Sequence, residues 1–269
     1  MTSPKIPTTS LNDSRIYLWD GGRYPSVTSV VGMLPKTGLQ FWIAKTVAQA
    51  AIDMSDVGLA PQQKDHHWLK TAANRERDQA AQVGTDIHEI VEHLAAGEEV
   101  DIPFEAEGFV DGFYSWRDKF QPEWRMAEET VFGWYDNNDD IFEDTPHGYA
   151  GSFDAIVDIK DETWLIDYKT TRSGVHPEVA LQLSAYANAE SVIRPDGTTA
   201  KIPDIDRFGV LWLRPDNWSF VEINAQQTPR DPFFHVFGAL LGTWHWENGL
   251  SKTALLPPLA SGGSRPRAF

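Results

Sequence analysis

The sequence predicts one mixed α/β domain, and three observations support that fold class. Helical apolar spacing dominates the chain up to Phe120, strand-like alternation begins after Pro122, and a helix followed by more strands completes the pattern. The chain has 269 residues, of which 41% are hydrophobic and 23% charged, as in ordinary globular proteins. This length suffices to bury one full core, so we expect a single domain over residues 15–250.

The N-terminal part of this domain, residues 28–120, is expected to be helical. Residues 25–28 offer an N-cap for its first helix. Gly84 is the expected joint within a long helical stretch, and Gly97 fits the C-cap of that stretch. Apolar residues recur at helical spacing in four segments: 29–34, 39–54, 66–96 and 104–120.

The core is expected over residues 123–224, followed by a C-terminal helix over 231–248. A flexible polar leader over 1–14 and a flexible tail over 257–269, rich in Pro, Gly, Ser and Arg, are expected to flank the domain. Helical spacing also occurs in residues 177–191. The expected strands are 15–19, 123–134, 149–159, 163–169, 208–213 and 219–223.

The charge of the chain is uneven. Lys and Arg number 23 against 39 Asp and Glu, which gives −16 overall, but residues 1–80 carry +2, residues 81–165 carry −18, and residues 166–269 carry no net charge. A nucleic-acid-binding protein usually has a basic face, which the whole-chain charge disfavours and the flanking thirds allow. The acidic middle has two interpretations: a solvated surface, or, for a few carboxylates, ligands of divalent cations.

Composition also excludes several kinds of site. There is no cysteine, so disulfides, thiol nucleophiles, zinc–thiolate sites and cysteine-ligated iron–sulfur clusters are excluded. The sequence has no run of about 18 apolar residues that could span a membrane. Its N-terminus lacks the apolar run of a secretory signal, so we expect a cytoplasmic protein without a membrane partner.

One expected hairpin concentrates charged residues. If its turn is centred on residues 160–161, Asp154 faces Asp167 and Ser152 faces Lys169. Side chains alternate along a strand, so both aspartates and the lysine share one face of the sheet. Two carboxylates directly opposite each other repel, and we therefore expect a compensating positive charge between them.

A divalent cation bound by Asp154 and Asp167 would supply that charge. Such a cation takes carboxylate oxygens, polarises a phosphate and lowers the pKa of its bound water. Lys169 would orient that water or stabilise charge on the phosphorane. The hairpin therefore fits metal-assisted phosphodiester hydrolysis. The alternative is a surface hairpin in which Lys169 forms an ordinary salt bridge, because an Asp-x-Lys pattern alone is common.

Two helices place polar residues where they could join this hairpin. Gln182 and Tyr186 are four residues apart on the following helix and share one face. His88 lies at the edge of an apolar stripe, with Glu92 one turn away as an orienting partner for a metal-ligating imidazole. Each feature also has a simpler interpretation: an ordinary polar helix face for the first, and a hydrogen-bonded residue at the core edge for the second.

Six motifs, taken in order, resemble the RecB-like exonuclease branch of the PD-(D/E)XK nuclease superfamily. Phage exonucleases and CRISPR-associated RecB-like nucleases are the most similar groups. The motifs are YPSVTSVVGML (24–34), VGTDIHEIVEHLAAGE (83–98), AEETVF (127–132), GYAGSFDAIVD (148–158), LIDYKTT (165–171) and QLSAY (182–186). Each motif alone is weak, whereas the ordered set is specific.

This resemblance implies a restriction-endonuclease-like core, with a central mixed β-sheet of αβββαβ type flanked by helices. The implied metal ligands are His88, Asp154, Asp167 and the main-chain carbonyl of Tyr168. The implied catalytic residues are Glu128, Asp154, Asp167, Lys169, Gln182 and Tyr186. Of two neighbouring acids, Glu128 matches the family's upstream glutamate better than Glu129, because Val131 then falls on the expected hydrophobic position.

The implied activity is that of an Mg²⁺- or Mn²⁺-dependent exonuclease that hydrolyses linear DNA with one or two bound ions. Its implied setting is phage recombination or replication in a bacterial cytoplasm, beside a strand-annealing or recombination protein. Many CRISPR-associated relatives hold an iron–sulfur cluster with four cysteines; this chain has none, and no such cluster is expected. Strand polarity, strandedness and homo-oligomerisation stay open.

Two other functions stay open at this point. A non-catalytic DNA-end-binding or assembly protein on the same fold would bind DNA without metal-dependent turnover, and a structure-specific endonuclease would cleave closed circles. The eleven tryptophans are either core residues or stacking surfaces for bases. A face that binds the DNA backbone, or merely a solvated surface, is formed by Lys36, Lys45, Lys64, Lys70, Arg75 and Arg77.

Overall fold

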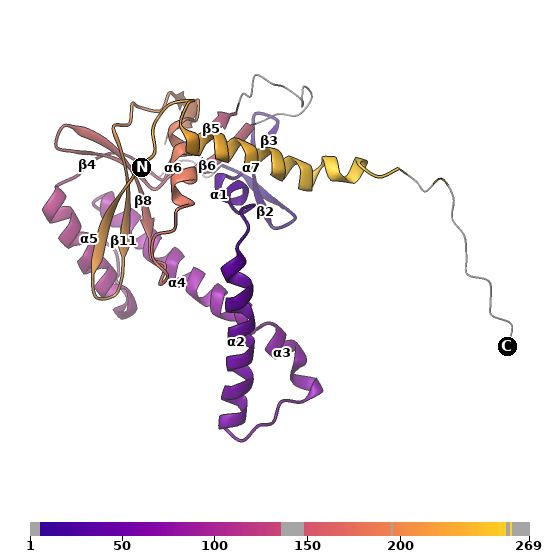
Figure 1. The fold of residues 1–269 in the computed structure, drawn as a ribbon. Coiled ribbons are helices and arrows are strands. Elements are labelled where there is room, and N and C mark those ends of the chain that lie inside the picture. Colours follow the sequence, from indigo (N-terminus) through magenta and orange to yellow (C-terminus); the bar gives the residue numbers. More distant parts are fainter. Residues whose placement is uncertain (1–5, 136–147, 195, 257–258, 260–269) are drawn as a thin grey trace.

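A five-stranded mixed sheet carries the centre of the fold (Figure 1). Its strand order is β12–β11–β8–β7–β4; β8 and β11 are parallel, and the other neighbours are antiparallel. The computed structural model describes residues 6–135, 148–194, 196–256 and 259. The strands of this sheet are β4 (Glu123–Ala127), β7 (Ala155–Ile159), β8 (Glu162–Lys169), β11 (Arg207–Leu213) and β12 (Trp218–Ile223).

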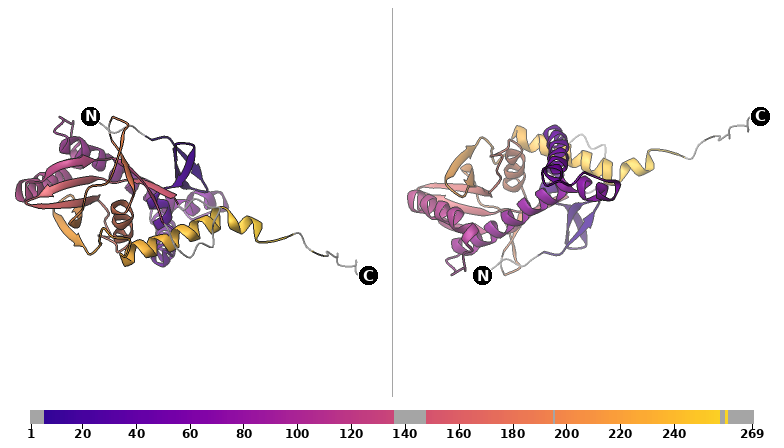
Figure 2. Two further views of the ribbon diagram at one scale, coloured as in Figure 1. Left: turned by 90° about the horizontal axis from the view of Figure 1, so that it is seen from above. Right: turned by 90° about the horizontal axis from the view of Figure 1, so that it is seen from below.

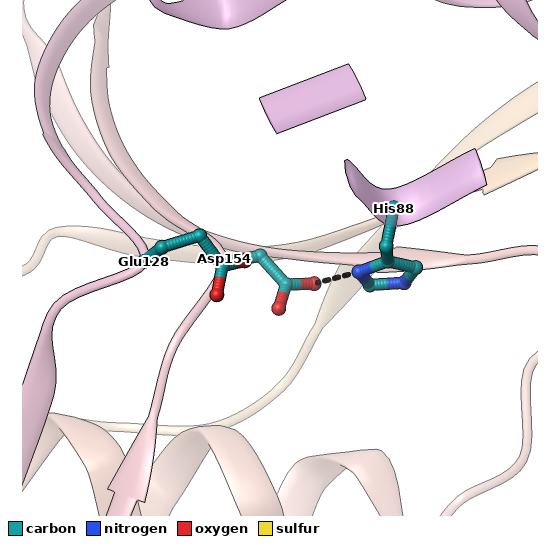
Figure 3. A group of neighbouring side chains, drawn as sticks. All are labelled: His88, Glu128 and Asp154. Atoms are coloured by element: carbon teal, nitrogen blue, oxygen red, sulfur yellow. Dashed lines mark ion pairs between the residues drawn. The ribbon is translucent and has the colours of Figure 1, made fainter. Parts of the chain in front are cut away.

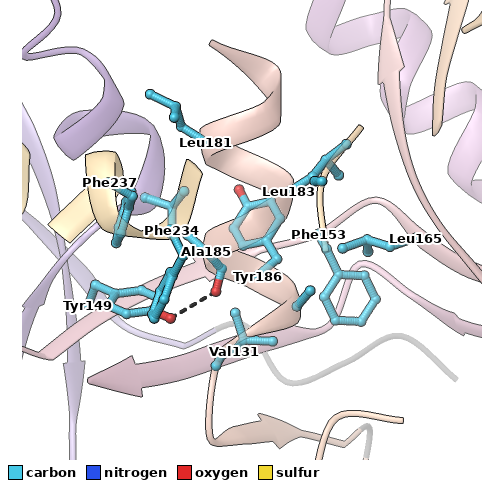
Figure 4. Packing of buried hydrophobic residues seen from close by; sticks show 14 of the residues in the cluster. Val131, Tyr149, Phe153, Leu165, Leu181, Leu183, Ala185, Tyr186, Phe234 and Phe237 are labelled. Atoms are coloured by element: carbon cyan, nitrogen blue, oxygen red, sulfur yellow. Dashed lines mark hydrogen bonds between the residues drawn. The ribbon is translucent and has the colours of Figure 1, made fainter. Parts of the chain in front are cut away.

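Helices cover both faces of this sheet, as the alternation of apolar residues requires. Ala155, Val157 and Ile166 pack on one face against α4 (Ala72–Ala95) and α5 (Glu107–Phe120). Ile156 and Leu165 point to the other face, where α6 (Val179–Ala187) and α7 (Pro232–Asn248) complete a second core (Figure 4). The expected mixed α/β fold class is therefore confirmed. The helices α5 (magenta) and α7 (yellow) lie on opposite sides of the molecule (Figure 2).

A second sheet, of order β10–β9–β5–β6, continues from the first. Its strands are β5 (Thr130–Trp134), β6 (Gly148–Ser152), β9 (Ser191–Ile193) and β10 (Thr199–Ala200). The unbroken strands expected over 123–134 and 149–159 are each two strands instead. Both break at the same level: Glu128 has a left-handed φ of 52°, and its N–H donates to the Asp154 carbonyl at 3.1 Å. The break places Ser152 opposite Thr130, so the expected pairing of Ser152 with Lys169 is wrong.

The N-terminal sheet consists of β1 (Thr8–Leu11), β2 (Ser14–Trp19) and β3 (Gly22–Pro25). The flexible leader expected over 1–14 is thus wrong for the part that pairs with β2 as β1. Ser26 caps α1 (Val27–Val31) by accepting from the Ser29 N–H, as expected. The tail expected over 257–269 lies outside the described residues except for position 259.

A helical extension, residues 36–77, projects away from the sheets (Figure 1). It comprises α2 (Thr37–Asp56), η1 (Gln63–Asp65), α3 (His66–Lys70) and the start of α4. The helix joint expected at Gly84 lies at Thr71 instead. Gly84 lies inside α4, and its lack of a side chain allows this helix to approach Thr170 closely. A Cβ at Gly84 would lie 3.2 Å from the Thr170 hydroxyl oxygen.

The remaining helical turns are η2 (Phe104–Ala106), directly before α5, and η3 (Leu250–Thr253), after α7. Gly97 follows the Ala96 C-cap of α4 with a φ of 74°. This is the left-handed conformation that favours glycine after a helix. Across the described ranges, no helix combines the length and apolar character needed to cross a bilayer.

Replacing Gly108 with alanine is expected to destabilise the fold. Its Cβ would lie 1.8 Å from the Pro215 carbonyl oxygen, because α5 packs directly on the β11–β12 turn. We expect Gly108→Ala to lower the free energy of unfolding by ~1–3 kcal/mol, the usual cost of overpacking. Gly242→Ala is the matched control: nothing lies within 4 Å of its Cβ, and helix propensity predicts a gain of ~0.5–1 kcal/mol. If denaturant melts give Gly108→Ala and Gly242→Ala the same free energy of unfolding, the close packing of α5 on the β11–β12 turn is contradicted.

Candidate metal centre

Three side chains from distant parts of the chain converge where the two larger sheets join (Figure 3). His88 comes from α4, Glu128 from the break between β4 and β5, and Asp154 from the break between β6 and β7. Each offers one ligand atom, and these atoms all lie within 4.8 Å of one another. An imidazole nitrogen and two carboxylates form a donor set that suits a divalent cation such as Mn²⁺ or Mg²⁺.

The main chain of Tyr168 orients two of these side chains. Its N–H donates a hydrogen bond to Asp154 Oδ2, and its carbonyl lies 2.6 Å from His88 Nε2. Because a carbonyl only accepts, Nε2 carries the proton in this contact, and a neutral imidazole then keeps a lone pair on Nδ1. His88 Nδ1 is 3.8 Å from Asp154 Oδ2. The imidazole nitrogen that can bind a cation therefore faces the carboxylate cluster.

The second expected metal-binding acid, Asp167, lies beside this cluster on β8. It is only 2% exposed. The Lys169 ammonium contacts both of its carboxylate oxygens, at 2.9 Å and 2.7 Å. Gln182 on α6 donates to Asp167 Oδ1 at 2.8 Å and lies 3.4 Å from the Tyr186 hydroxyl. The fold thus brings the expected acid, lysine, glutamine and tyrosine into one hydrogen-bonded group.

Burial and mutual repulsion perturb the acids of this centre. Burial, followed by the charges of Asp154, Glu92 and Asp167, raises the pKa of Glu128 to about 9. Burial also raises the pKa of Asp154 to about 6, against the lowering effect of His88. Carboxylates held close enough to resist ionisation are stabilised by a cation. The residues present therefore fit a divalent metal ion.

Lys169 keeps its positive charge in this environment. Burial lowers its pKa, but the carboxylates of Asp167 and Asp154 together outweigh that effect, and the net pKa is raised. An ammonium that stays protonated is a hydrogen-bond donor and a source of positive charge, not a base. Lys169 can therefore stabilise negative charge that develops next to the cluster.

The two neighbouring glutamates separate clearly. Glu128 belongs to the cluster, as expected, whereas Glu129 is buried, with Arg194 and Asp196 as the charged groups that affect its pKa. The two side chains point to different surroundings because the chain breaks between β4 and β5, and not because side chains alternate along one continuous strand. Sequence reasoning missed the bond from the Tyr168 N–H to Asp154, because no side-chain pattern marks a main-chain donor.

The raised pKa of Glu128 predicts how the metal-free protein responds to pH. Since the folded pKa of about 9 exceeds the ordinary 4.5, the folded state binds more protons between these values, and its stability falls as pH rises. With chelator at pH 8, Glu128→Gln should have a free energy of unfolding higher than that of the wild type by ~1.4 kcal/mol or more, the free energy that corresponds to a change of one in pKa. Denaturant melts between pH 6 and 9 measure this. The exposed Glu123 on β4 provides the control, Glu123→Gln. If the free energy of unfolding depends on pH to the same extent in both variants, the prediction is contradicted.

Comparisons with known proteins add little to this picture. No family model matches the chain, and no curated protein matches it. A solved structure described as "Crystal structure of SSO0001" aligns at 14% sequence identity with a TM-score of 0.36, covering 78% of this chain and 87% of the other. A likeness this weak carries no conclusion, so the residues of the centre bear the functional argument.

Proposed function

We propose that the protein is a divalent-metal-dependent DNA exonuclease that hydrolyses phosphodiester bonds. The observation that carries the proposal is the convergence of His88, Glu128 and Asp154 within 4.8 Å, next to the Asp167–Lys169 pair. The proposal is supported by the order in which the chain forms the five-stranded sheet and the helices next to it: α5, β4, β7, β8, α6 and β11, with β5, β6, β9 and β10 in the second sheet. This order is compatible with the αβββαβ core that the sequence resemblance implies. A setting in phage DNA recombination, with a strand-annealing partner in a bacterial cytoplasm, rests on that resemblance alone.

One or two Mg²⁺ or Mn²⁺ ions are the proposed cofactor. The residues that would hold them are His88, Glu128, Asp154, Asp167 and the carbonyl of Tyr168. A divalent cation bound there would polarise the phosphate and lower the pKa of its bound water. The Tyr168 N–H keeps Asp154 in place through its hydrogen bond, and Gln182 does the same for Asp167.

The remaining polar residues act on the substrate. The Lys169 ammonium, fixed by both oxygens of Asp167, donates hydrogen bonds to the attacking water and to the phosphate oxygens as negative charge accumulates on them. Water adds to phosphorus and releases one proton to solvent, the bond from phosphorus to the leaving sugar oxygen breaks, and that oxygen takes up a proton from solvent. On α6, Gln182 would hold Asp167 and contact the DNA strand, while Tyr186, one turn later and only 3% exposed, supports Gln182 from 3.4 Å.

DNA substrates of defined ends test the proposal. Single strands and duplexes labelled at either end, together with closed circles, are incubated with Mn²⁺, Mg²⁺ or chelator. We expect metal-dependent loss of linear DNA that spares circles, and the order in which label is released gives the polarity. Cleavage of circles would identify an endonuclease instead. DNA binding by folded protein without turnover in any metal would identify a DNA-end-binding protein.

A further inference from the structure

The helical extension, residues 36–77, differs in charge from the surface that follows it. It holds six lysines and arginines against four acids, Asp53, Asp56, Asp65 and Glu76, and a fifth acid, Asp78, follows directly and pairs with Arg77 at 3.0 Å. Residues 81–165, in contrast, carry −18. All six cations are exposed. A cationic projection on an acidic protein is complementary to a polyanion.

An ordered aromatic and cationic pair lies on this extension. The Arg75 guanidinium lies over the Trp68 ring, 4.4 Å from its centroid. It is fixed there because Arg75 donates to the Trp68 carbonyl at 2.6 Å and to the Thr71 hydroxyl at 2.8 Å. Trp68 is nevertheless 46% exposed. One face of the indole is therefore covered by a positive charge, and the exposed remainder is a surface on which a base can stack.

Helix α4 connects this pair to the metal centre. It runs unbroken from Ala72 to Ala95 and carries both Arg75 and His88. At 1.5 Å per residue, these two residues lie ~20 Å apart along the helix axis. This distance corresponds to about six nucleotides at the ~3.4 Å spacing of a stacked strand, and to fewer nucleotides of an extended strand. Arg77 precedes His88 by three helical turns, so it lies on nearly the same face of α4, whereas Arg75 lies roughly 140° away around the helix. The helix is also held close to Thr170, next to Lys169, by its contact at Gly84.

We propose that Trp68, Arg75 and Arg77 form a binding platform for a single DNA strand, about six nucleotides from the phosphate at the metal centre. Trp68 stacks on one base and Arg75 binds the phosphate next to it, while Arg77, on the face of α4 that carries His88, binds a phosphate nearer to the metal centre. Stacking requires an unpaired base, so the occupant is a single strand or the frayed end of a duplex. This inference rests on the proposed function, because the strand that the platform holds is the one hydrolysed at His88, Asp154 and Asp167.

Binding measurements in chelator test the platform without cleavage. A fluorescent twelve-nucleotide oligothymidylate is titrated with the full chain. We expect Trp68→Ala to weaken binding about tenfold, within the range measured for one stacked base, and Trp68→Phe to restore part of it. Trp246→Ala is the matched control, since Trp246 is 50% exposed on α7, a helix outside the extension. It should bind like the wild type.

Arg75 has a matched control of its own. Arg117 lies over Tyr114 at 4.6 Å on α5, a cation–aromatic pair outside the extension. Arg75→Ala should weaken binding severalfold and flatten its salt dependence, because a phosphate contact is lost. Arg117→Ala should change neither. Thermal melts confirm that each variant is folded.

Strand length separates a substrate contact from a purely structural effect. A dinucleotide at the metal centre is too short to reach Trp68 even when it is extended, so Trp68→Ala should lower kcat/KM for the twelve-nucleotide strand and not for the dinucleotide. If the wild type cleaves DNA and Trp68→Ala binds as tightly as Trp246→Ala, the platform is wrong and the proposed nuclease stands. If binding depends on Trp68 but no metal supports cleavage, the proposed nuclease is wrong and the DNA-binding surface stands. A wild type that does not bind DNA overturns both.

Discussion

Lys169→Ala is expected to lower kcat for DNA cleavage by about 10²–10³-fold, the usual cost of removing one group that stabilises developing charge. The ammonium of Lys169 is held 2.7 Å from Asp167 Oδ2 and stays protonated, so in the proposed nuclease it would supply positive charge beside the scissile phosphate. Metal binding should persist in this variant, because Lys169 supplies no ligand atom. Single-turnover cleavage and Mn²⁺ titration of the same preparation measure the two effects separately.

The exposed Lys201 provides the control for this experiment. Lys201→Ala carries the same change in net charge and should cleave DNA at the wild-type rate. Retained cleavage by Lys169→Ala, with the control also active, would remove the lysine from the mechanism. Loss of Mn²⁺ binding in Lys169→Ala would instead show that this lysine supports the fold of the metal centre.

Asp154→Asn is expected to abolish both metal binding and cleavage. Asp154 lies between His88 and Glu128 in the cluster (Figure 3) and is oriented by the Tyr168 N–H, so its loss removes the central ligand. A cation that binds only the folded state stabilises it by about 2.7 kcal/mol at a hundredfold excess over Kd. We expect the wild type to gain this stability from Mn²⁺ and Asp154→Asn to gain almost none. Thermal melts with and without Mn²⁺ measure the difference.

Asp158 is the matched control on the same stretch of chain. It lies on β7, four residues after Asp154, and pairs with Arg125 at 2.6 Å, with its side chain 23% exposed. Asp158→Asn should keep the full stabilisation by Mn²⁺. Equal stabilisation of Asp154→Asn and Asp158→Asn would contradict the assignment of the metal centre.

The hairpin of β7 and β8, which holds the proposed catalytic residues, could be predicted from the sequence because its determinants are local. Alternating apolar residues set the faces of β7 and β8, and a tight turn sets the register. The observed pairs Ala155–Ile166 and Ile156–Leu165 agree with the expected register. Lys160, in the turn, has a left-handed φ of 58°. Asp167 and Lys169 could be placed together for the same reason.

The strand breaks could not be predicted because they depend on tertiary contacts. The left-handed φ of Glu128 is stabilised by main-chain bonds to a segment more than twenty residues away, around Asp154. No local preference of a glutamate marks such a conformation. Gly84 shows the same limit: a glycine within a helical pattern reads as a joint, whereas here it serves the approach of α4 to Thr170. The convergence of His88 with these breaks likewise required the folded chain.

Anomalous scattering from a crystal grown with Mn²⁺ tests the central claim most directly. We expect an anomalous peak bounded by His88 Nδ1 and the carboxylates of Glu128 and Asp154, and we expect crystals of Asp154→Asn to lack it. Peaks confined to other sites, with these three side chains unchanged and uncoordinated, would contradict a metal-dependent nuclease at this centre.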